Sequence, residues 1–127
     1  MAKILIVEDN GSNMKLMEYL LRAFGHTALT ARDGEAGLTA ALEHRPELVL
    51  MDLHMPTMDG FESCRRMREH DILRAMPIVA VTASAMVGDR DLILARGFDG
   101  YIAKPITPET FVQQVEQFIP AGREGVQ

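Results

Sequence analysis

The 127-residue sequence lacks several features that mark specialised classes of protein. It has one cysteine, Cys64, so an internal disulfide bond is impossible and a reducing compartment, the cytoplasm, is the expected location. No apolar run approaches the roughly 20 residues of a membrane span. The N-terminal MAKILIVEDN reaches acidic residues too early for a signal peptide. Lysine and arginine number 13 against 18 acidic residues, and the net charge of −5 argues against a nucleic-acid or anionic-membrane partner.

Internal repeats, linkers and low-complexity segments are also missing from the sequence. A chain of this length fits one domain. Such a domain buries roughly two-thirds of its unfolded surface, so it needs no covalent or metal staple. We expect residues 1–120 to form this domain and residues 121–127 to form a flexible C-terminal tail.

Short apolar runs bounded by turn residues are typical of strands buried on both faces. We predict strands over residues 4–7, 26–31, 48–52, 78–82 and 100–103. Segments with helical spacing or capping residues alternate with them, over residues 14–24, 36–44, 61–70, 83–96 and 108–119. Thr107 is the expected cap of the last helix.

Strands that alternate with helices indicate right-handed crossovers and a parallel sheet. The simplest fold at this length is α/β, a doubly wound five-stranded parallel sheet in the flavodoxin-like order 2-1-3-4-5. Ligands bind such sheets beyond the carboxyl ends of the strands, at the point where the strand order reverses. That point lies between the first and third strands.

Acidic side chains stand at the ends of the two strands that flank this point. Glu8 and Asp9 follow the first strand, and Asp52 ends the third. Neighbouring strands lie about 4.8 Å apart, so these acids would crowd one pocket, where they cannot all stay ionised without compensation. Thr82 ends the fourth strand and Lys104 follows the fifth, at the same edge.

A hard divalent cation would compensate the acidic cluster. Mg²⁺ prefers oxygen ligands, takes one or two carboxylates and often shares phosphate oxygens. Aspartate is a known phosphoryl carrier, and phosphoryl transfer depends mainly on positioning and charge neutralisation. Asp52 stands alone after the central strand and is the better nucleophile candidate. Asp9, assisted by Glu8, is better placed to hold the metal, while Thr82 and Lys104 could contact phosphoryl oxygens.

Together these motifs resemble the receiver domain of bacterial two-component response regulators, the CheY-like family. The resemblance spans residues 3–119 in order and spacing. The motifs that carry it are Glu8-Asp9, Asp52 with Met55-Pro56 and Asp59-Gly60, Thr82-Ala83, and Lys104-Pro105. Asn10, Asn13 and the segment VTASAM look most like single-domain regulators of the DivK type and receivers attached to hybrid kinases.

The resemblance implies a specific phosphorylation site. Asp52 would accept a phosphoryl group from a histidine kinase or a His phosphotransfer protein. Mg²⁺ would be held by Asp9, Asp52 and the backbone carbonyl of His54, with Glu8 acting through water. The His54 side chain either influences the water that hydrolyses the aspartyl phosphate or is simply exposed, and both interpretations stay open.

The resemblance also implies a switch. Thr82 and Tyr101 would form the switch pair, although an aromatic residue at a strand end is often a half-buried packing side chain. The Lys104–Pro105 peptide would be cis. Phosphorylation would then reshape the face formed by the fourth helix, fifth strand and fifth helix, to control a protein partner or to relay the phosphoryl group onward.

We expect the protein to be a signalling switch that catalyses only its own phosphorylation and dephosphorylation. The sequence has no room for a DNA-binding or enzymatic output domain. We expect a free-standing monomer that can dimerise on phosphorylation, and the alternative is a receiver that belongs to a hybrid histidine kinase or a larger regulator.

Two other classes of protein share parts of the pattern. Magnesium-dependent phosphatases of the haloacid dehalogenase type also form an aspartyl phosphate, but residues 52–56 lack the second aspartate of their DxDx[TV] motif. A flavodoxin-like FMN carrier would need a neutral Ser/Thr/Gly-rich phosphate loop where this sequence has the acidic DNGSN. The four histidines show no metal-ligand spacing, and Cys64 is expected to be a core thiol.

Overall fold

The computed structural model describes residues 1–83 and 87–120. Strands and helices alternate along the chain, with one short 3-10 helix at Asp71–Leu73. The strands are β1 (Lys3–Val7), β2 (Thr27–Ala31), β3 (Leu48–Asp52), β4 (Ile78–Thr82) and β5 (Gly100–Ala103). The α-helices are α1 (Gly11–Ala23), α2 (Gly34–His44), α3 (Gly60–Arg68), α4 (Val87–Ala95) and α5 (Pro108–Glu116).

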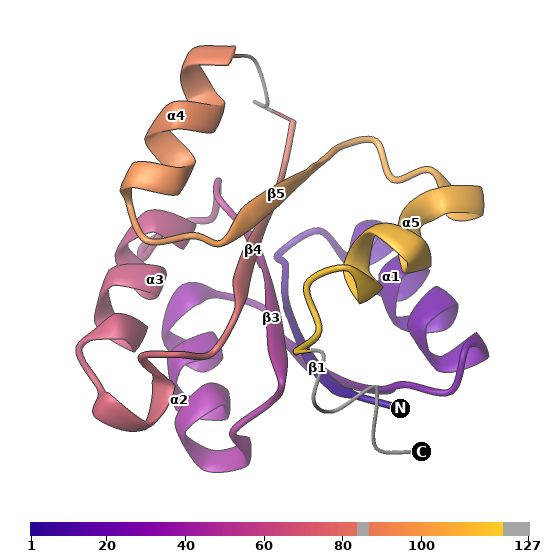
Figure 1. Ribbon diagram of the computed structural model, residues 1–127, viewed down its shortest axis with the longest axis horizontal. Helices are drawn as coiled ribbons and strands as arrows, with labels where there is room; N and C mark the ends of the chain where they lie inside the picture. Colours follow the sequence, from indigo (N-terminus) through magenta and orange to yellow (C-terminus); the bar gives the residue numbers. More distant parts are fainter. Residues whose placement is uncertain (84–86, 121–127) are drawn as a thin grey trace.

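The five strands form one parallel sheet in the order β2-β1-β3-β4-β5. Figure 1 shows α1 and α5 on one face of the sheet and α2, α3 and α4 on the other. This arrangement confirms the predicted doubly wound fold and its strand order. It also places the carboxyl ends of β1 and β3 side by side.

Each face of the sheet packs its own hydrophobic core. Alternate strand residues point to opposite faces, so Ile6 and Leu50 pack with α1 and α5, while Val7 and Met51 pack against the other layer. Every residue of β3 and β4 is buried, which explains why they are continuous apolar runs. Full burial of each large aliphatic side chain contributes roughly 1.5–3 kcal/mol.

Cys64 lies in the core layer on the side of α2, α3 and α4, as expected of a packing thiol. Burial raises the pKa of its thiol to about 11, so the unreactive protonated form is favoured at neutral pH. His26 is a buried polar residue that the sequence did not single out. Its Nδ1 accepts the Ala2 amide hydrogen at 3.0 Å and its Nε2 lies 2.8 Å from Glu116 Oε2, which joins the N-terminal segment to α5.

Three helices begin earlier than the sequence predicted. Helix α1 starts at Gly11 rather than at residue 14. Helices α2 and α3 start early because residues read as turn formers are N-caps. The side chain of Asp33 accepts the Ala36 amide hydrogen at 2.7 Å, and Asp59 accepts that of Glu62 at 2.9 Å. A side-chain oxygen in this position satisfies a free amide of the first turn. Helices α2 and α3 therefore start at Gly34 and Gly60 rather than at residues 36 and 61.

The last two helices also differ from the prediction. Ala83 is not helical, residues 84–86 lie outside the described residues, and described α4 spans Val87–Ala95 instead of 83–96. Thr107 occupies the N-cap position of α5, but its side chain makes no capping hydrogen bond. Helix α5 ends at Glu116, short of residue 119. The expected tail, residues 121–127, lies outside the described residues. No helix in the described part of the chain could span a membrane.

Candidate functional site

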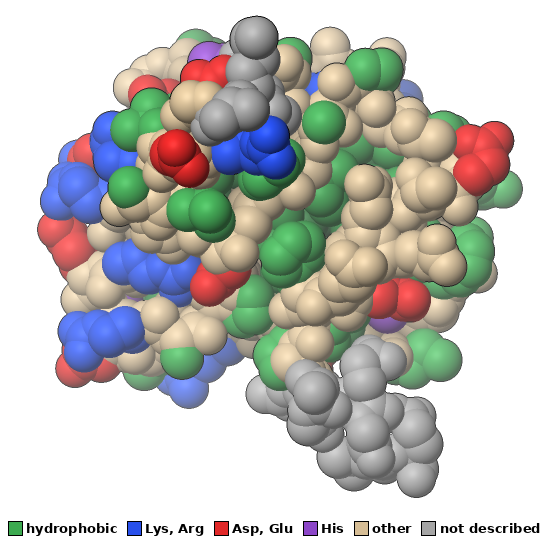
Figure 2. All heavy atoms as spheres, turned by 45° about the horizontal axis from the view of Figure 1, so that its top comes forward, with side chains coloured by type: hydrophobic (Ala, Val, Ile, Leu, Met, Phe, Trp, Pro, Cys, Tyr) green, Lys and Arg blue, Asp and Glu red, His purple; other side chains and the backbone are tan. Residues whose placement is uncertain are grey.

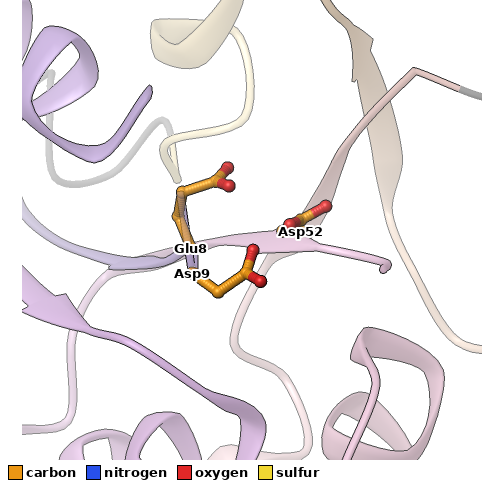
Figure 3. Close-up of side chains that lie close together, drawn as sticks. All are labelled: Glu8, Asp9 and Asp52. Carbon is orange, nitrogen blue, oxygen red and sulfur yellow. The ribbon is translucent and has the colours of Figure 1, made fainter. Parts of the chain in front are cut away.

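Three carboxylates meet at the carboxyl edge of the sheet. Val7 of β1 pairs with Met51 of β3, so the residues that follow Val7 lie next to Asp52. One oxygen each from Glu8, Asp9 and Asp52 lie within 4.8 Å of one another. Figure 3 shows the three side chains converging from the ends of the two strands.

The three acids differ in their exposure. Glu8 is completely buried, Asp52 is 5% exposed, and Asp9 is exposed. Local backbone amides stabilise the two buried carboxylates: Asn10 donates to Glu8 Oε2 at 3.2 Å, and His54 donates to Asp52 Oδ1 at 3.3 Å. Glu8 and Asp52 are therefore the buried members of the cluster, and Asp9 is its exposed member.

Lys104 is the basic partner of this cluster. Its backbone amide donates to the carbonyl of Thr82 at 2.9 Å, directly after β5. Its Nζ lies 3.1 Å from Glu8 Oε1 and 3.4 Å from Asp52 Oδ1. Among the described residues this ammonium pairs with two of the three carboxylates, Glu8 and Asp52, so the site retains excess negative charge when all of these groups are ionised.

Glu8 shows the electrostatic cost of this arrangement. Burial raises the pKa of its carboxyl above the ordinary value, and the Asp52 carboxylate raises it further. Lys104 opposes both effects through its hydrogen bond to Glu8 and through its positive charge. Oε1 of Glu8 is buried and accepts no hydrogen bond within the described structure, although the Lys104 ammonium is close. Buried carboxylate oxygens are normally satisfied by a hydrogen bond, water or an ion.

These residues fit a hard divalent cation. The donor set consists of carboxylate oxygens, which Mg²⁺ prefers. The cluster also carries more negative than positive charge, and one of its buried oxygens lacks a hydrogen bond. Asp9 and Asp52 would be direct ligands. Glu8 lies deeper and in contact with Lys104, which suits the indirect role expected for it.

The remaining predicted site residues differ in how far they are buried. Thr82 is fully buried at the end of β4, and Tyr101 is half-buried on β5. The side chain of His54 is exposed. The Lys104–Pro105 peptide bond is cis.

Sequence reasoning missed the contact between Gly60 and the proposed acceptor. A Cβ atom at Gly60 would collide with the carbonyl oxygen of Asp52 and lie 2.9 Å from Leu53 Cα. The Gly60 amide also donates to the carbonyl of Leu53 at 3.0 Å. Helix α3 thus begins directly against the peptide of Asp52. The Asp59-Gly60 pair predicts a turn from the sequence, but it does not predict that this turn contacts the backbone of Asp52.

Comparison with known proteins identifies the family. Residues 4–116 match the response regulator receiver domain. This chain belongs to that family. The receiver is 40% identical over 116 residues to the polar-differentiation response regulator DivK of Brucella anthropi, a match that covers 91% of this chain and 94% of that protein.

Solved structures of receivers are similar to this one. Chemotaxis protein CheY4 of Vibrio cholerae matches with a TM-score of 0.88 and 29% identity, over 94% of this chain and 99% of that chain. A sensor histidine kinase receiver domain from Pseudomonas aeruginosa matches with a TM-score of 0.84 and 33% identity, over 92% of this chain and 96% of that one. The latter structure has a magnesium ion coordinated in its active-site cleft.

The family match confirms the resemblance found in the sequence. Receiver domains are signalling switches of two-component systems, and response regulators interact with histidine kinases and downstream proteins. The acidic cluster of this receiver is compatible with Mg²⁺. Neither the phosphatase nor the FMN-carrier alternative gains support from these relatives.

Proposed function

We propose that this receiver accepts a phosphoryl group on Asp52 and responds by changing its contacts with other proteins. The observation that carries the proposal is the cluster at the edge of the sheet. Oxygens of Glu8, Asp9 and Asp52 lie within 4.8 Å of one another, and Lys104 faces two of these residues. The phosphodonor is a histidine kinase or a His phosphotransfer protein.

Asp52 is the nucleophile in this proposal. A carboxylate oxygen attacks the phosphorus of a phosphohistidine, so that the new O–P bond forms as the P–N bond breaks and the electron pair leaves with the donor imidazole. Lys104, 3.4 Å from Asp52 Oδ1, is placed to neutralise a phosphoryl oxygen. Thr82, buried beside it at the end of β4, offers a hydroxyl donor to a second oxygen. Fixed groups of this kind stabilise phosphoryl transfer.

Mg²⁺ is the cofactor of the proposed reaction. Asp9, Asp52 and the carbonyl of His54 would hold the ion, and Glu8 would act through water. When bound, the ion neutralises negative charge on the transferring phosphoryl group. The excess of carboxylate over ammonium in the described site supports this assignment, as does the magnesium ion in the Pseudomonas aeruginosa relative.

Thr82 and Tyr101 form the switch in this proposal. The new phosphoryl oxygens draw the Thr82 hydroxyl inward, and Tyr101 follows. The face made by α4, β5 and α5 then changes its shape and its affinity for a downstream protein. Leu92 and Leu94 of α4 are 45% and 50% exposed, so α4 itself presents apolar area that a partner protein could cover.

Incubation with acetyl phosphate and Mg²⁺ tests the phosphorylation. We expect an intact-mass increase of one phosphoryl group, stable in acid and labile in base. The increase should disappear in Asp52→Asn and with EDTA. Asp91→Asn, which changes an exposed carboxyl on α4, should label like the parent protein. Equal labelling of Asp52→Asn would refute the proposal.

The exposed His54 side chain is a further proposed participant, because it lies two residues after the acceptor and donates its backbone amide to Asp52. We propose that its imidazole orients the water that hydrolyses the aspartyl phosphate. The phosphoryl lifetime of His54→Ala should then differ from that of the parent protein. Equal lifetimes would leave only the backbone of His54 in the site.

A further inference from the structure

Tyr101 has a specific neighbour on α4. The guanidinium carbon of Arg90 lies 5.8 Å from the centroid of the Tyr101 ring. A guanidinium within about 6 Å of a tyrosine ring is attracted to the negative face of its π system. Tyr101 is half-buried and packs against the core layer on the same side of the sheet as α4, so the contact joins α4 to β5.

The described side chains in the first half of α4 are mostly exposed. Asp89 is half-buried and the rest of residues 88–92 are exposed, so Ile93 is the first buried side chain among the described residues of the helix. A Cβ at Gly88 would have no atom within 4 Å. Because segments with few buried contacts move most easily, one side-chain contact can shift the position of this half of α4.

The positive charge of Arg90 is available for its contact with the Tyr101 ring. Figure 2 shows that lysine and arginine side chains on this face gather toward α3 and α4, with acidic side chains between them. The three arginines of α3 are paired with carboxylates: Arg65, Arg66 and Arg68. Within the described part of the chain Arg90 forms no ion pair, so its charge is not neutralised by a neighbouring acid.

We propose that Arg90 is a positioning residue for Tyr101 and opposes the phosphorylation-driven switch. The contact holds the tyrosine ring against α4 in the unphosphorylated protein. Movement of Tyr101 breaks the contact and releases the first half of α4. This inference rests on the proposed switch role of Tyr101 and adds the group that sets the resting position of the switch.

The expected size of the effect follows from the strength of the contact. A cation–π contact at an exposed site biases a two-state equilibrium by roughly two- to five-fold. A ligand of Asp52 that favours the moved state must overcome this bias. Removing Arg90 should therefore tighten the apparent affinity for such a ligand by the same factor. A residue that only stabilised the fold would not tighten it.

The chain allows a direct readout of Tyr101. It contains two tyrosines and no tryptophan, and Tyr19 is 71% exposed on α1. A Tyr19→Phe background labelled with fluorotyrosine gives one ¹⁹F resonance, from Tyr101. Beryllofluoride, a stable phosphoryl mimic, is titrated at fixed Mg²⁺. Its bound fluorides report binding at Asp52 in the same spectrum.

Three variants in this background test the proposal. Arg90→Gln should lower the midpoint of the Tyr101 response roughly two- to five-fold, and Arg90→Lys should give a smaller change because lysine stacks less well. The matched control is Arg96→Gln. Arg96 lies 4.8 Å from the centroid of the Phe61 ring, so this variant removes a cation–π contact that does not involve Tyr101, and the midpoint should stay unchanged.

The outcomes separate the inference from the proposed function. An unchanged or raised midpoint in Arg90→Gln overturns the role of Arg90 while the switch stands. If the bound fluorides appear in the parent protein but the Tyr101 resonance does not move, the switch role of Tyr101 fails, and the role of Arg90 fails with it. If no fluoride binds, the proposed acceptor site itself is wrong.

Discussion

Glu8 is the residue at which the unfavourable electrostatics of the site concentrate. It is fully buried, its Oε1 accepts no hydrogen bond in the described structure, and Asp52 adds a second negative charge beside it. A raised carboxyl pKa means that the fold favours the protonated form. The contribution of Glu8 to stability is thus fully present below its ordinary pKa of 4.5 and is lost as the pH rises through the raised folded value.

Glu8→Gln should therefore stabilise the metal-free protein at neutral pH. The amide keeps the shape of the side chain and removes a charge that burial and Asp52 disfavour more than Lys104 favours it. We expect a net gain of about 1 kcal/mol. The gain should shrink as the pH falls toward 4.5. Urea denaturation in EDTA at several pH values measures it, with exposed Glu109→Gln as the control. A less stable Glu8→Gln at neutral pH would contradict this view of the site.

Gly60 is the second residue with a defined effect on the acceptor. A Cβ there collides with the Asp52 carbonyl oxygen and lies 3.1 Å from the Asp52 carbonyl carbon, so Gly60→Ala must displace the acceptor backbone. Displacements of about 1 Å can cost roughly 100-fold in rate, and we expect labelling by acetyl phosphate to slow at least ~10-fold. In Gly88→Ala, where a Cβ meets no atom within 4 Å, the labelling rate should be unchanged. Equal rates for the two variants would show that Gly60 does not position Asp52.

At the level of elements, the loop between β3 and α3 holds backbone strain beside the site. Thr57 has a φ of 70°, a left-handed conformation that a β-branched residue rarely adopts. The neighbouring backbone bonds from Met58 to Pro56 and from Gly60 to Leu53 fix the path of this loop. Strained residues of this kind persist where the surrounding structure determines the conformation.

Thr57→Gly should relieve this strain and stabilise the protein by about 1 kcal/mol. The matched control is Thr39→Gly, in the middle of α2 on an exposed position, which should destabilise by roughly 0.5 kcal/mol because glycine disfavours helix. Thermal and urea unfolding measure both. If both variants lose stability by similar amounts, the backbone at Thr57 is not strained.

The elements also show what the sequence can and cannot predict. Strands β3 and β4 were predictable because both faces are buried, so their apolar residues are continuous. The starts of α2 and α3 were placed too late, because an aspartate before a glycine is typical of both a turn and an N-cap. The start of α4 falls next to residues 84–86, which lie outside the described residues.

The candidate site also has features that the sequence predicts and features that it does not. The meeting of Glu8, Asp9 and Asp52 follows from strand order alone, because neighbouring parallel strands end at one edge. The double contact of Lys104 and the approach of Gly60 to Asp52 depend on side-chain rotamers and on the path of a loop. Neither leaves a periodic signal in the sequence.

At the scale of the whole molecule, Arg68 ties together the end of the sheet opposite the site. Its guanidinium donates to the carbonyls of Met76 at 2.6 Å and Gly97 at 2.9 Å, and to Asp99 Oδ2 at 2.9 Å. Asp99 Oδ2 also accepts the Ile78 amide hydrogen at 2.8 Å. One side chain thus joins α3, the start of β4 and the turn between α4 and β5.

Arg68→Ala should destabilise the whole domain by about 2–4 kcal/mol, because several buried or half-buried acceptors lose their donor. Arg66→Ala removes only an exposed ion pair with Glu62 and should change stability by less than about 1 kcal/mol. Urea denaturation compares the two variants. Similar losses in both would show that Arg68 is an ordinary surface arginine.

Chemical mapping of the phosphoryl group tests the central claim most directly. The full chain is treated with acetyl phosphate and Mg²⁺ and then with borohydride, which reduces an aspartyl phosphate to homoserine, and peptides are analysed by mass spectrometry. We predict homoserine at position 52 alone, dependent on both the phosphodonor and Mg²⁺. Homoserine at Asp9 or Asp59 instead, or at no position, would contradict the assignment of Asp52 as the phosphoacceptor.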